Sequence, residues 1–211
     1  MGAMQAQDYP GIGCFGVDYA SFLVLQRGDA AGAQAYMREF ASPTCPEFNR
    51  RVVQGLAHYM AWAQAKDPER ADSLRQARVF LPVSPRLFYE LATSERGVPV
   101  ARQLLAIGEK LGMQDNEQLD ALAYALRIKE TAVARKLLQL GADPMAEVGP
   151  EKMPAALIPV LNRDPEGIRL MQRAGVDYGK LRYQGATALD YARKQGDVKL
   201  QQMLDPKGAS V

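Results

Sequence analysis

Histidine, cysteine and long apolar runs are scarce in this sequence. Its 211 residues include one histidine and two cysteines, too few imidazole and thiolate groups for the usual four-ligand transition-metal sites. The most apolar stretch, residues 153–161, contains two prolines and is shorter than the roughly 20 apolar residues that a membrane-spanning helix needs. We therefore expect no protein-ligated metal and no membrane insertion.

The sequence also lacks an excess of charge of one sign. Lys and Arg number 26 and Asp and Glu number 24, which leaves a formal net charge of +2. Proteins that bind nucleic acid through phosphate contacts concentrate positive charge on one surface. Nucleic acid is therefore not an expected partner.

Groups that could carry out catalysis are equally scarce. His58 stands alone in a predicted helix, and Cys45 precedes it by thirteen residues, which separates the two by several helical turns. Asp164 and Glu166 are typical of a helix start, where carboxylates favour the positive end of the helix dipole. The glycines do not follow a phosphate-loop spacing. We expect no enzyme and no cofactor.

What the sequence does contain is an internal repeat. Three similar apolar segments end in glycine, and the numbers of these glycines differ by 141 − 108 = 33 and 175 − 141 = 34. A period of about 33 residues indicates stacked supersecondary units. The segments are Val100-Ala-Arg-Gln-Leu-Leu-Ala-Ile-Gly108, Val133-Ala-Arg-Lys-Leu-Leu-Gln-Leu-Gly141 and Gly167-Ile-Arg-Leu-Met-Gln-Arg-Ala-Gly175.

The C-terminal stretch 185–204 reads as one helix hairpin. Thr187 is a good N-cap, Gly196 permits a tight reversal, and Leu200, Met203 and Leu204 form the apolar stripe of a second helix. Such a hairpin cannot bury its apolar face alone, so it needs neighbours of the same kind.

This stretch resembles an ankyrin repeat through Gly185, Thr187, Leu189, Ala192 and Gly196. Ala188 and Asp190 replace the usual Pro and His, which we expect to weaken the hydrogen bonding of the loop. The resemblance implies an all-α ankyrin-repeat helical solenoid of four repeats over residues 84–204. It also implies a surface, built from first helices and projecting turns, that binds a protein partner.

Three local features are predicted inside the array. Gly97-Val98-Pro99 should form the internal turn of the first repeat, and Asp115 or Asn116 should start the second. Pro159 should kink or shorten the first helix of the third repeat, because proline removes a backbone donor.

The residues before the array divide into a start and a cap. Residues 1–7 look like a vector-derived start, and residues 8–83 form an N-terminal helical cap or, alternatively, degenerate repeats. Helices are predicted from Asp29 to Phe40, from Pro46 and from Asp67. After the array, residues 205–211 have no core residue and should fray.

Two turns of the array are the expected partner-binding elements, residues 141–149 and 175–184. The second carries tyrosine and arginine, which are enriched at binding hot spots, although Tyr183 or Leu181 could equally pack the turn onto its neighbour. The candidate partner-binding residues are Asp143, Met145, Glu147, Asp177, Tyr178, Lys180, Arg182 and Tyr183.

The two cysteines, Cys14 and Cys45, both precede the repeats. If they pair, the disulfide closes a loop of about 30 residues, stabilises the cap by roughly 3 kcal/mol and indicates an oxidising compartment such as the bacterial periplasm. The alternative is two unrelated thiols in a cytoplasmic protein.

Two functions fit these patterns. In size, repeat type and inferred compartment the chain looks like the ankyrin-type immunity proteins that protect bacteria from their own secreted antibacterial effectors. It would then be a periplasmic inhibitor, monomeric when unbound, that covers the cleft of an effector such as a peptidoglycan hydrolase. The alternative is an intracellular ankyrin adaptor that links protein partners without inhibiting them.

Overall fold

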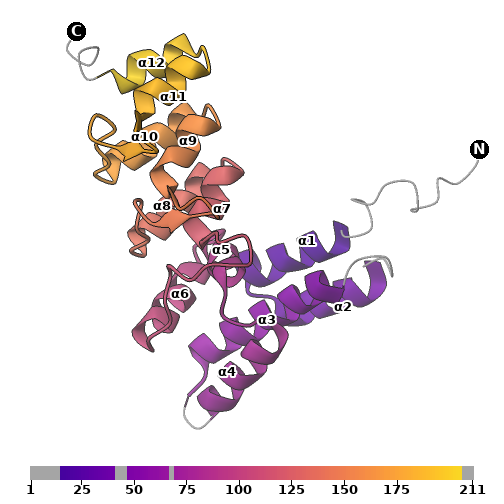
Figure 1. The fold of residues 1–211 in the computed structure, drawn as a ribbon. Helices are drawn as coiled ribbons and strands as arrows, with labels where there is room; N and C mark the ends of the chain where they lie inside the picture. The colour runs from indigo at the N-terminus through magenta and orange to yellow at the C-terminus, as the bar shows by residue number, and fades with distance from the viewer. Residues whose placement is uncertain (1–14, 41–46, 67–68, 206–211) are drawn as a thin grey trace, which may run out of the picture. The chain divides into compact units, whose positions relative to one another are not determined.

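The protein is mostly helical and divides into two compact units. The computed structural model describes residues 15–40, 47–66 and 69–205, and Figure 1 traces their elements in chain order. The first unit comprises residues 1–83 and 93–109, and the second comprises residues 84–92 and 110–211. No helix of the described ranges is long and apolar enough to cross a membrane. Cys14, Cys45, residues 1–7 and the tail after Asp205 lie outside the described residues.

The first unit contains the helices predicted after Asp29, Pro46 and Asp67, which are α2, α3 and α4. Gly28, with a φ of 70°, ends the helical segment that precedes α2. The elements of this unit are α1 (Phe15–Phe22), the π-helical turn η3 (Leu23–Arg27), α2 (Ala30–Phe40), α3 (Glu47–Gln64), α4 (Glu69–Phe80) and α6 (Gly97–Ala106).

The core of the first unit lies where α3 packs against α4 and against Leu81, the residue that follows α4. Tyr59 and Trp62 of α3 are buried together with Leu81. The Tyr59 hydroxyl donates a hydrogen bond to the Leu81 carbonyl oxygen at 2.9 Å, and burial raises the pKa of Tyr59. Gly55 allows this approach, because a Cβ atom at that position would lie 2.2 Å from the Leu81 Cβ.

The boundary between the two units passes through the first predicted repeat. Its first helix, α5 (Pro85–Ala92), belongs to the second unit, and α6 belongs to the first. The expectation that Gly97-Val98-Pro99 forms a turn is wrong. Gly97 begins α6, and its amide donates to the Ser94 hydroxyl oxygen at 2.9 Å. Pro99 fits there because the first turn of a helix needs no amide donor.

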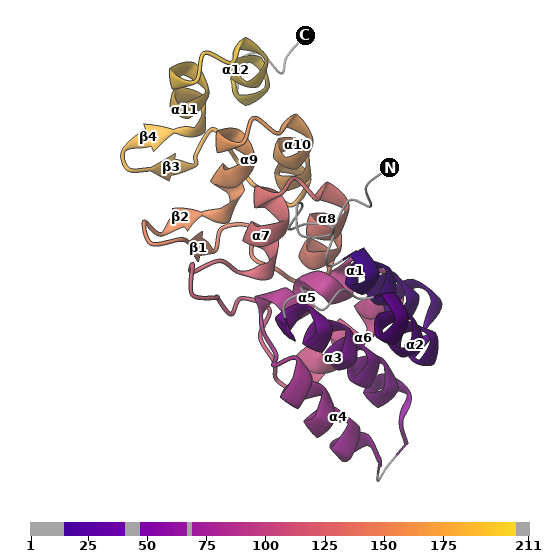
Figure 2. The same ribbon diagram turned by 90° about the vertical axis from the view of Figure 1, so that its right-hand side faces the viewer.

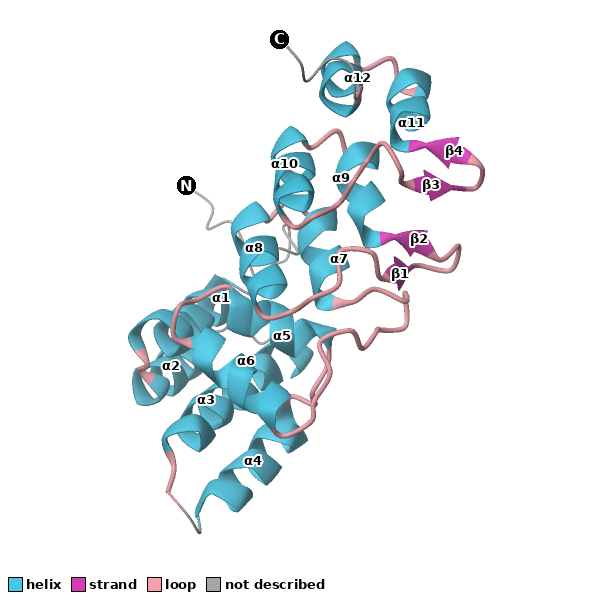
Figure 3. Cartoon of the chain, turned by 90° about the vertical axis from the view of Figure 1, so that its left-hand side faces the viewer, coloured by secondary structure: helices cyan, strands magenta, loops and turns pink. Residues whose placement is uncertain are grey.

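The second unit contains three further helix pairs and two short antiparallel hairpins. Figures 2 and 3 show the hairpins next to one another, each leading into the first helix of the following pair. The elements after α5 are α7 (Ala121–Arg127), α8 (Thr131–Gln139), β1 (Glu147–Val148), β2 (Met153–Pro154), the 3-10 turn η4 (Ala155–Leu157), α9 (Ile158–Leu161), α10 (Pro165–Arg173), β3 (Arg182–Tyr183), β4 (Ala186–Thr187), α11 (Ala188–Lys194) and α12 (Val198–Leu204).

Glycines at the predicted period end the second helix of successive pairs in the same way. Gly108, Gly141 and Gly175 have φ values of 95°, 101° and 93°, a left-handed conformation that glycine adopts without steric cost. The amides of the following residues, Glu109, Ala142 and Val176, donate to the carbonyls of Leu104, Leu137 and Met171 at 3.1, 3.0 and 3.0 Å. This is the hydrogen bond of the Schellman motif.

The first helices end in the same motif at a second set of repeated positions. Lys129, Arg163 and Gly196 have positive φ values of 61°, 52° and 69°, and their numbers differ by 163 − 129 = 34 and 196 − 163 = 33. The amides of Glu130, Asp164 and Asp197 donate to carbonyls five residues earlier at 2.9, 2.8 and 3.2 Å. The C-terminal ends of the first helices and those of the second helices therefore repeat with the same period.

Side-chain amides connect neighbouring pairs at a third repeated position. Asn162 Nδ2 donates to the Arg127 carbonyl oxygen at 3.0 Å, and Gln195 Nε2 donates to the Leu161 carbonyl oxygen at 3.4 Å. These carbonyls lie at helix C-termini, where no partner exists within the helix. Each amide thus joins one first helix to the preceding one.

The helix starts differ in part from expectation. The second repeat's first helix follows the N-cap Asp120, whose carboxylate accepts from the Ala123 amide at 2.7 Å, and does not start at Asp115 or Asn116. Asp115 instead accepts from the Leu119 amide within the preceding loop. The first helix of the third repeat is short, since α9 has only four residues and follows the 3-10 turn η4. Pro159 lies in its first turn, where a missing amide donor costs no intrahelical hydrogen bond.

We expect Gly55→Ala to destabilise the first unit by about 1–3 kcal/mol, because the new methyl group overlaps Leu81 in a packed core. Trp62 is the single tryptophan and is buried beside this contact, so urea unfolding followed by its fluorescence reports on this unit. Gln76→Ala, an exposed change on α4 of the same unit, is the control and should leave the midpoint nearly unchanged. An unchanged unfolding midpoint for Gly55→Ala would contradict the close packing of α3.

We expect Asn162→Ala and Gln195→Ala each to lower the stability of the second unit by about 1 kcal/mol, the usual net worth of one hydrogen bond. Urea unfolding followed by circular dichroism measures this loss, and the Trp62 transition serves as an internal reference. Ile128 ends α7 as Asn162 ends α9 and has no side-chain amide. Ile128→Ala should therefore have a smaller effect, and equal effects would argue against coupling through the amides.

Candidate protein-binding surface

The tips of the two hairpins are joined by side-chain hydrogen bonds. Positive φ values at Lys152, Gln184 and Gly185 close the turns. The Tyr183 hydroxyl donates to the Glu151 carbonyl oxygen at 3.1 Å, and Gln184 Nε2 donates to the Glu151 carboxylate at 3.1 Å. The tip of the second hairpin is thus held against the tip of the first.

The first hairpin is held in turn by the loop that precedes α7. Gln114 Nε2 donates to the Glu147 carbonyl oxygen at 2.6 Å, and the Gly149 amide donates to the Gln118 carbonyl oxygen at 2.8 Å. Three consecutive loops of the second unit are therefore linked side by side. We call the exposed surface of the two hairpins and this loop the hairpin surface.

Tyr183 packs against Tyr191 and helps to hold the second hairpin in place. Its ring stacks on that of Tyr191 with centroids 6.4 Å apart, and the Tyr191 hydroxyl donates to the Tyr183 carbonyl oxygen at 3.2 Å. Partial removal from water and the hydrogen bond to Glu151 raise the pKa of Tyr183. The side chain is half-buried, so it both packs the turn and presents one edge to solvent.

Arg182 is an exposed cation of this surface. It pairs with Thr187 in the register of β3 and β4, and its Nη1 donates to the Gly179 carbonyl oxygen at 2.8 Å. This contact to its own turn positions the guanidinium group. The remaining donors can reach a partner, since guanidinium carries five N–H groups.

Tyr178 is buried, although the sequence placed it among the exposed binding residues. Only 4% of its surface is accessible, and its hydroxyl donates to the Ala156 carbonyl oxygen at 2.8 Å. Burial raises the pKa of Tyr178. In this conformation the ring anchors the turn after α10 to the pair α9–α10 and presents no surface to a partner.

Asp143 and Asp177 shape the two turns from equivalent positions, one repeat period apart. Each carboxylate accepts from the amide two residues later, that of Met145 at 2.8 Å and that of Gly179 at 2.9 Å. This is the Asx turn. The hydrogen bond from Lys180 is the main cause that lowers the pKa of Asp177.

The other candidate residues are exposed. Met145 exposes 44% of its surface, and Glu147 and Lys180 are also accessible to solvent. These side chains, with Arg182 and the edge of Tyr183, mix apolar, acidic and basic groups. Such a mixture suits a protein surface better than a single small ligand.

The sequence did not single out a cluster of tyrosine and arginine on α5 and α7. The rings of Tyr89 and Tyr124 meet edge to face with centroids 4.9 Å apart. Arg86 lies 5.8 Å from the Tyr89 ring centre and Arg127 lies 5.7 Å from the Tyr124 ring centre. In each Arg/Tyr pair the two residues are three positions apart, and residues i and i+3 share a helix face. This spacing could have been recognised in the sequence. This cluster offers the same hot-spot residue types.

Asp190 strengthens its loop, contrary to the expectation that it would weaken the hydrogen bonding there. Its carboxylate accepts from the Thr187 amide at 2.9 Å and from the Thr187 hydroxyl at 2.7 Å. The Asp190 amide donates to the Thr187 hydroxyl oxygen at 3.0 Å, which completes a capping box. These hydrogen bonds from Thr187 lower the pKa of Asp190.

His58 has a packing role. Its ring stacks on Phe80 with centroids 5.3 Å apart and planes 3° from parallel. Within residues 15–40, 47–66 and 69–205, no three His, Cys, Asp or Glu side chains are grouped so that they could hold a metal ion.

We expect the pKa of Asp190, measured by carboxyl NMR, to lie below the usual value and to rise in Thr187→Val. A folded-state pKa below the unfolded value contributes stability above the unfolded pKa, and that contribution is lost as the pH falls through the folded pKa. Asp177, whose pKa is lowered by Lys180, is the internal control and should not change. An Asp190 pKa that is the same in both proteins would show that the capping box does not form.

No protein-family model matches the sequence, and the search of curated proteins likewise finds no match.

Proposed function

We propose that this chain is a protein-binding repeat protein of the ankyrin type, and that residues 110–204 bind a partner through the hairpin surface. The observation that carries the proposal is the recurrence of two Schellman turns with one common period along the chain. Each helix pair buries its apolar face against its neighbours, and the hairpins between the pairs leave their side chains in solvent. Arrays of this kind act by surface contact.

The hairpin surface has the properties that a partner needs. The loops are fixed to one another by Gln114, Glu151 and Tyr183, so little conformational entropy is lost on binding. Arg182 and the edge of Tyr183 are residue types enriched at hot spots. A standard interface buries about 800 Å² on each partner, which two hairpins with the adjoining helices α9 and α11 can supply.

We further propose that the partner is a secreted antibacterial effector, such as a peptidoglycan hydrolase, and that the chain is its periplasmic immunity protein. The support is the family resemblance, the size of the chain and the two cysteines outside the repeats. Binding over the effector's cleft would exclude its substrate. The chain itself needs no reacting group for this role.

We expect Arg182→Ala to weaken binding of the partner by more than about 1 kcal/mol, as the truncation of a hot-spot residue does. The partner is captured from an extract of the source cell with the full chain, identified by mass spectrometry and titrated by calorimetry. Lys199→Ala, an exposed change on α12, is the control. Equal affinity of both variants would place the interface away from the hairpin surface.

The captured partner also tests the immunity role. The wild-type chain should inhibit hydrolysis of purified peptidoglycan by a captured hydrolase, and a cell that lacks the chain should be sensitive to that enzyme. Capture of several cytosolic proteins and no hydrolase would favour an intracellular adaptor and refute the immunity role.

A further inference from the structure

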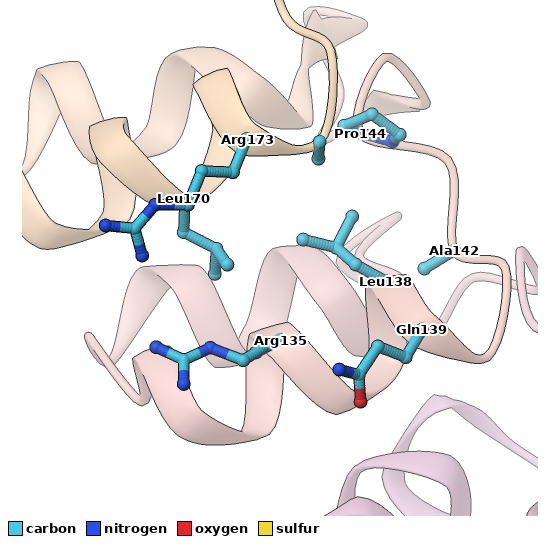
Figure 4. A pocket seen from close by; sticks show the side chains of 8 residues that line it. Arg135, Leu138, Gln139, Ala142, Pro144, Leu170 and Arg173 are labelled. Atoms are coloured by element: carbon cyan, nitrogen blue, oxygen red, sulfur yellow. The ribbon is translucent and has the colours of Figure 1, made fainter.

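A groove lies between α8 and α10, at a place that the hairpin surface does not include. It is open to solvent and has a volume of about 490 Å³. Leu138 of α8 and Leu170 of α10 line its middle, and Figure 4 shows these side chains between the two helices. Pro144 and Ala142 close one end. A cavity of this size is within the range of pockets that hold ligands.

The groove continues into a second cavity. The second cavity has a volume of about 420 Å³ and shares Pro144 and Ala174 with the first. It extends along the turns after α8 and α10 as far as Lys180. The two open cavities therefore adjoin, and an elongated groove of this kind suits an extended chain better than a compact small molecule.

The other end of the groove is positively charged. Arg135 of α8 and Arg173 of α10 line it, and Figure 4 shows both guanidinium groups at the same end. Among the described residues neither arginine has an ion-pair or hydrogen-bond partner, whereas Arg169, on the same helix as Arg173, is paired with Glu166 at 2.5 Å. Asp177 is the only acidic residue of the lining, and it is paired with Lys180 at 3.4 Å.

We propose that this groove binds an extended acidic peptide segment of a partner protein. An apolar side chain of the peptide lies between Leu138 and Leu170, and carboxylates of the peptide pair with Arg135 and Arg173. Arginine suits this task because its planar group accepts a carboxylate in a bidentate manner. The groove is a second docking surface, and its existence does not depend on binding at the hairpins.

The probe is a fluorescein-labelled peptide of alternating Glu and Leu residues, about ten residues long, which spans roughly 33 Å when extended. Fluorescence anisotropy measures its affinity for the full chain. We expect binding that weakens as salt is added, because exposed charges are screened. The double variant Arg135→Ala with Arg173→Ala should bind about fivefold or more weakly, as the loss of two partly exposed ion pairs implies.

The chain provides a matched control. Arg102 lies in the segment 100–108 at the position that Arg135 has in the segment 133–141, and it does not line the groove. Arg102→Ala and the hairpin variant Arg182→Ala should therefore bind the peptide like the wild type. Failure of the proposed hairpin interface would leave these results unchanged, so the two proposals are tested separately.

Several outcomes would overturn the inference. The wild-type chain could fail to bind the Glu/Leu peptide, or the double variant could bind it equally well. Equal binding of a Glu/Ser peptide or of a Lys/Leu peptide would also contradict the inference. Displacement of the bound peptide by decanoate at low concentration would assign the groove to a small amphipathic anion. NMR shifts of the Leu138 and Leu170 methyl groups on addition of the peptide would locate it independently of any variant.

Discussion

The hydrogen-bonded reversal that ends each of the helices α7 to α11 is the constraint on which the second unit depends. An amide donates to a carbonyl five residues earlier, and this geometry requires one residue with positive φ. The reversal caps the helix and directs the chain back along it, so each pair forms a short hairpin that its neighbours must cover. Lys129 and Arg163 adopt this conformation without being glycine, at a cost of roughly 1–2 kcal/mol each. The packing of the pairs offsets that cost.

The two proposed docking surfaces follow from the same arrangement. Because consecutive pairs start one repeat period apart, the loops between them lie side by side and can be joined by Gln114, Glu151 and Tyr183. The second helices α8 and α10 also lie side by side, and the groove runs between them. Asn162 and Gln195 hold neighbouring first helices together. Repetition thus produces fixed backbones whose exposed side chains differ from one pair to the next.

The sequence allowed the period and much of the helical architecture to be predicted, because glycines at a regular spacing indicate left-handed helix ends. It did not reveal the equivalent turns at Lys129 and Arg163, which carry no glycine. Gly97 was misread as a turn because glycine also tolerates the helical conformation. Tyr178 was misplaced because spacing in a turn does not give side-chain direction. The arginines of the groove were not predictable either, since Arg135 and Arg173 occupy different positions within their repeats and meet only when α8 and α10 pack.

Amide hydrogen exchange by NMR at Glu130, Asp164 and Asp197 tests the repeated reversal most directly. These three amides form the recurring hydrogen bonds to Ala125, Pro159 and Ala192. If the helix pairs repeat as described, all three exchange far more slowly than amides of an unfolded peptide. Exchange of any one of them at the unfolded rate would contradict the repeat, and with it the proposal that the chain acts through surfaces built by stacked pairs.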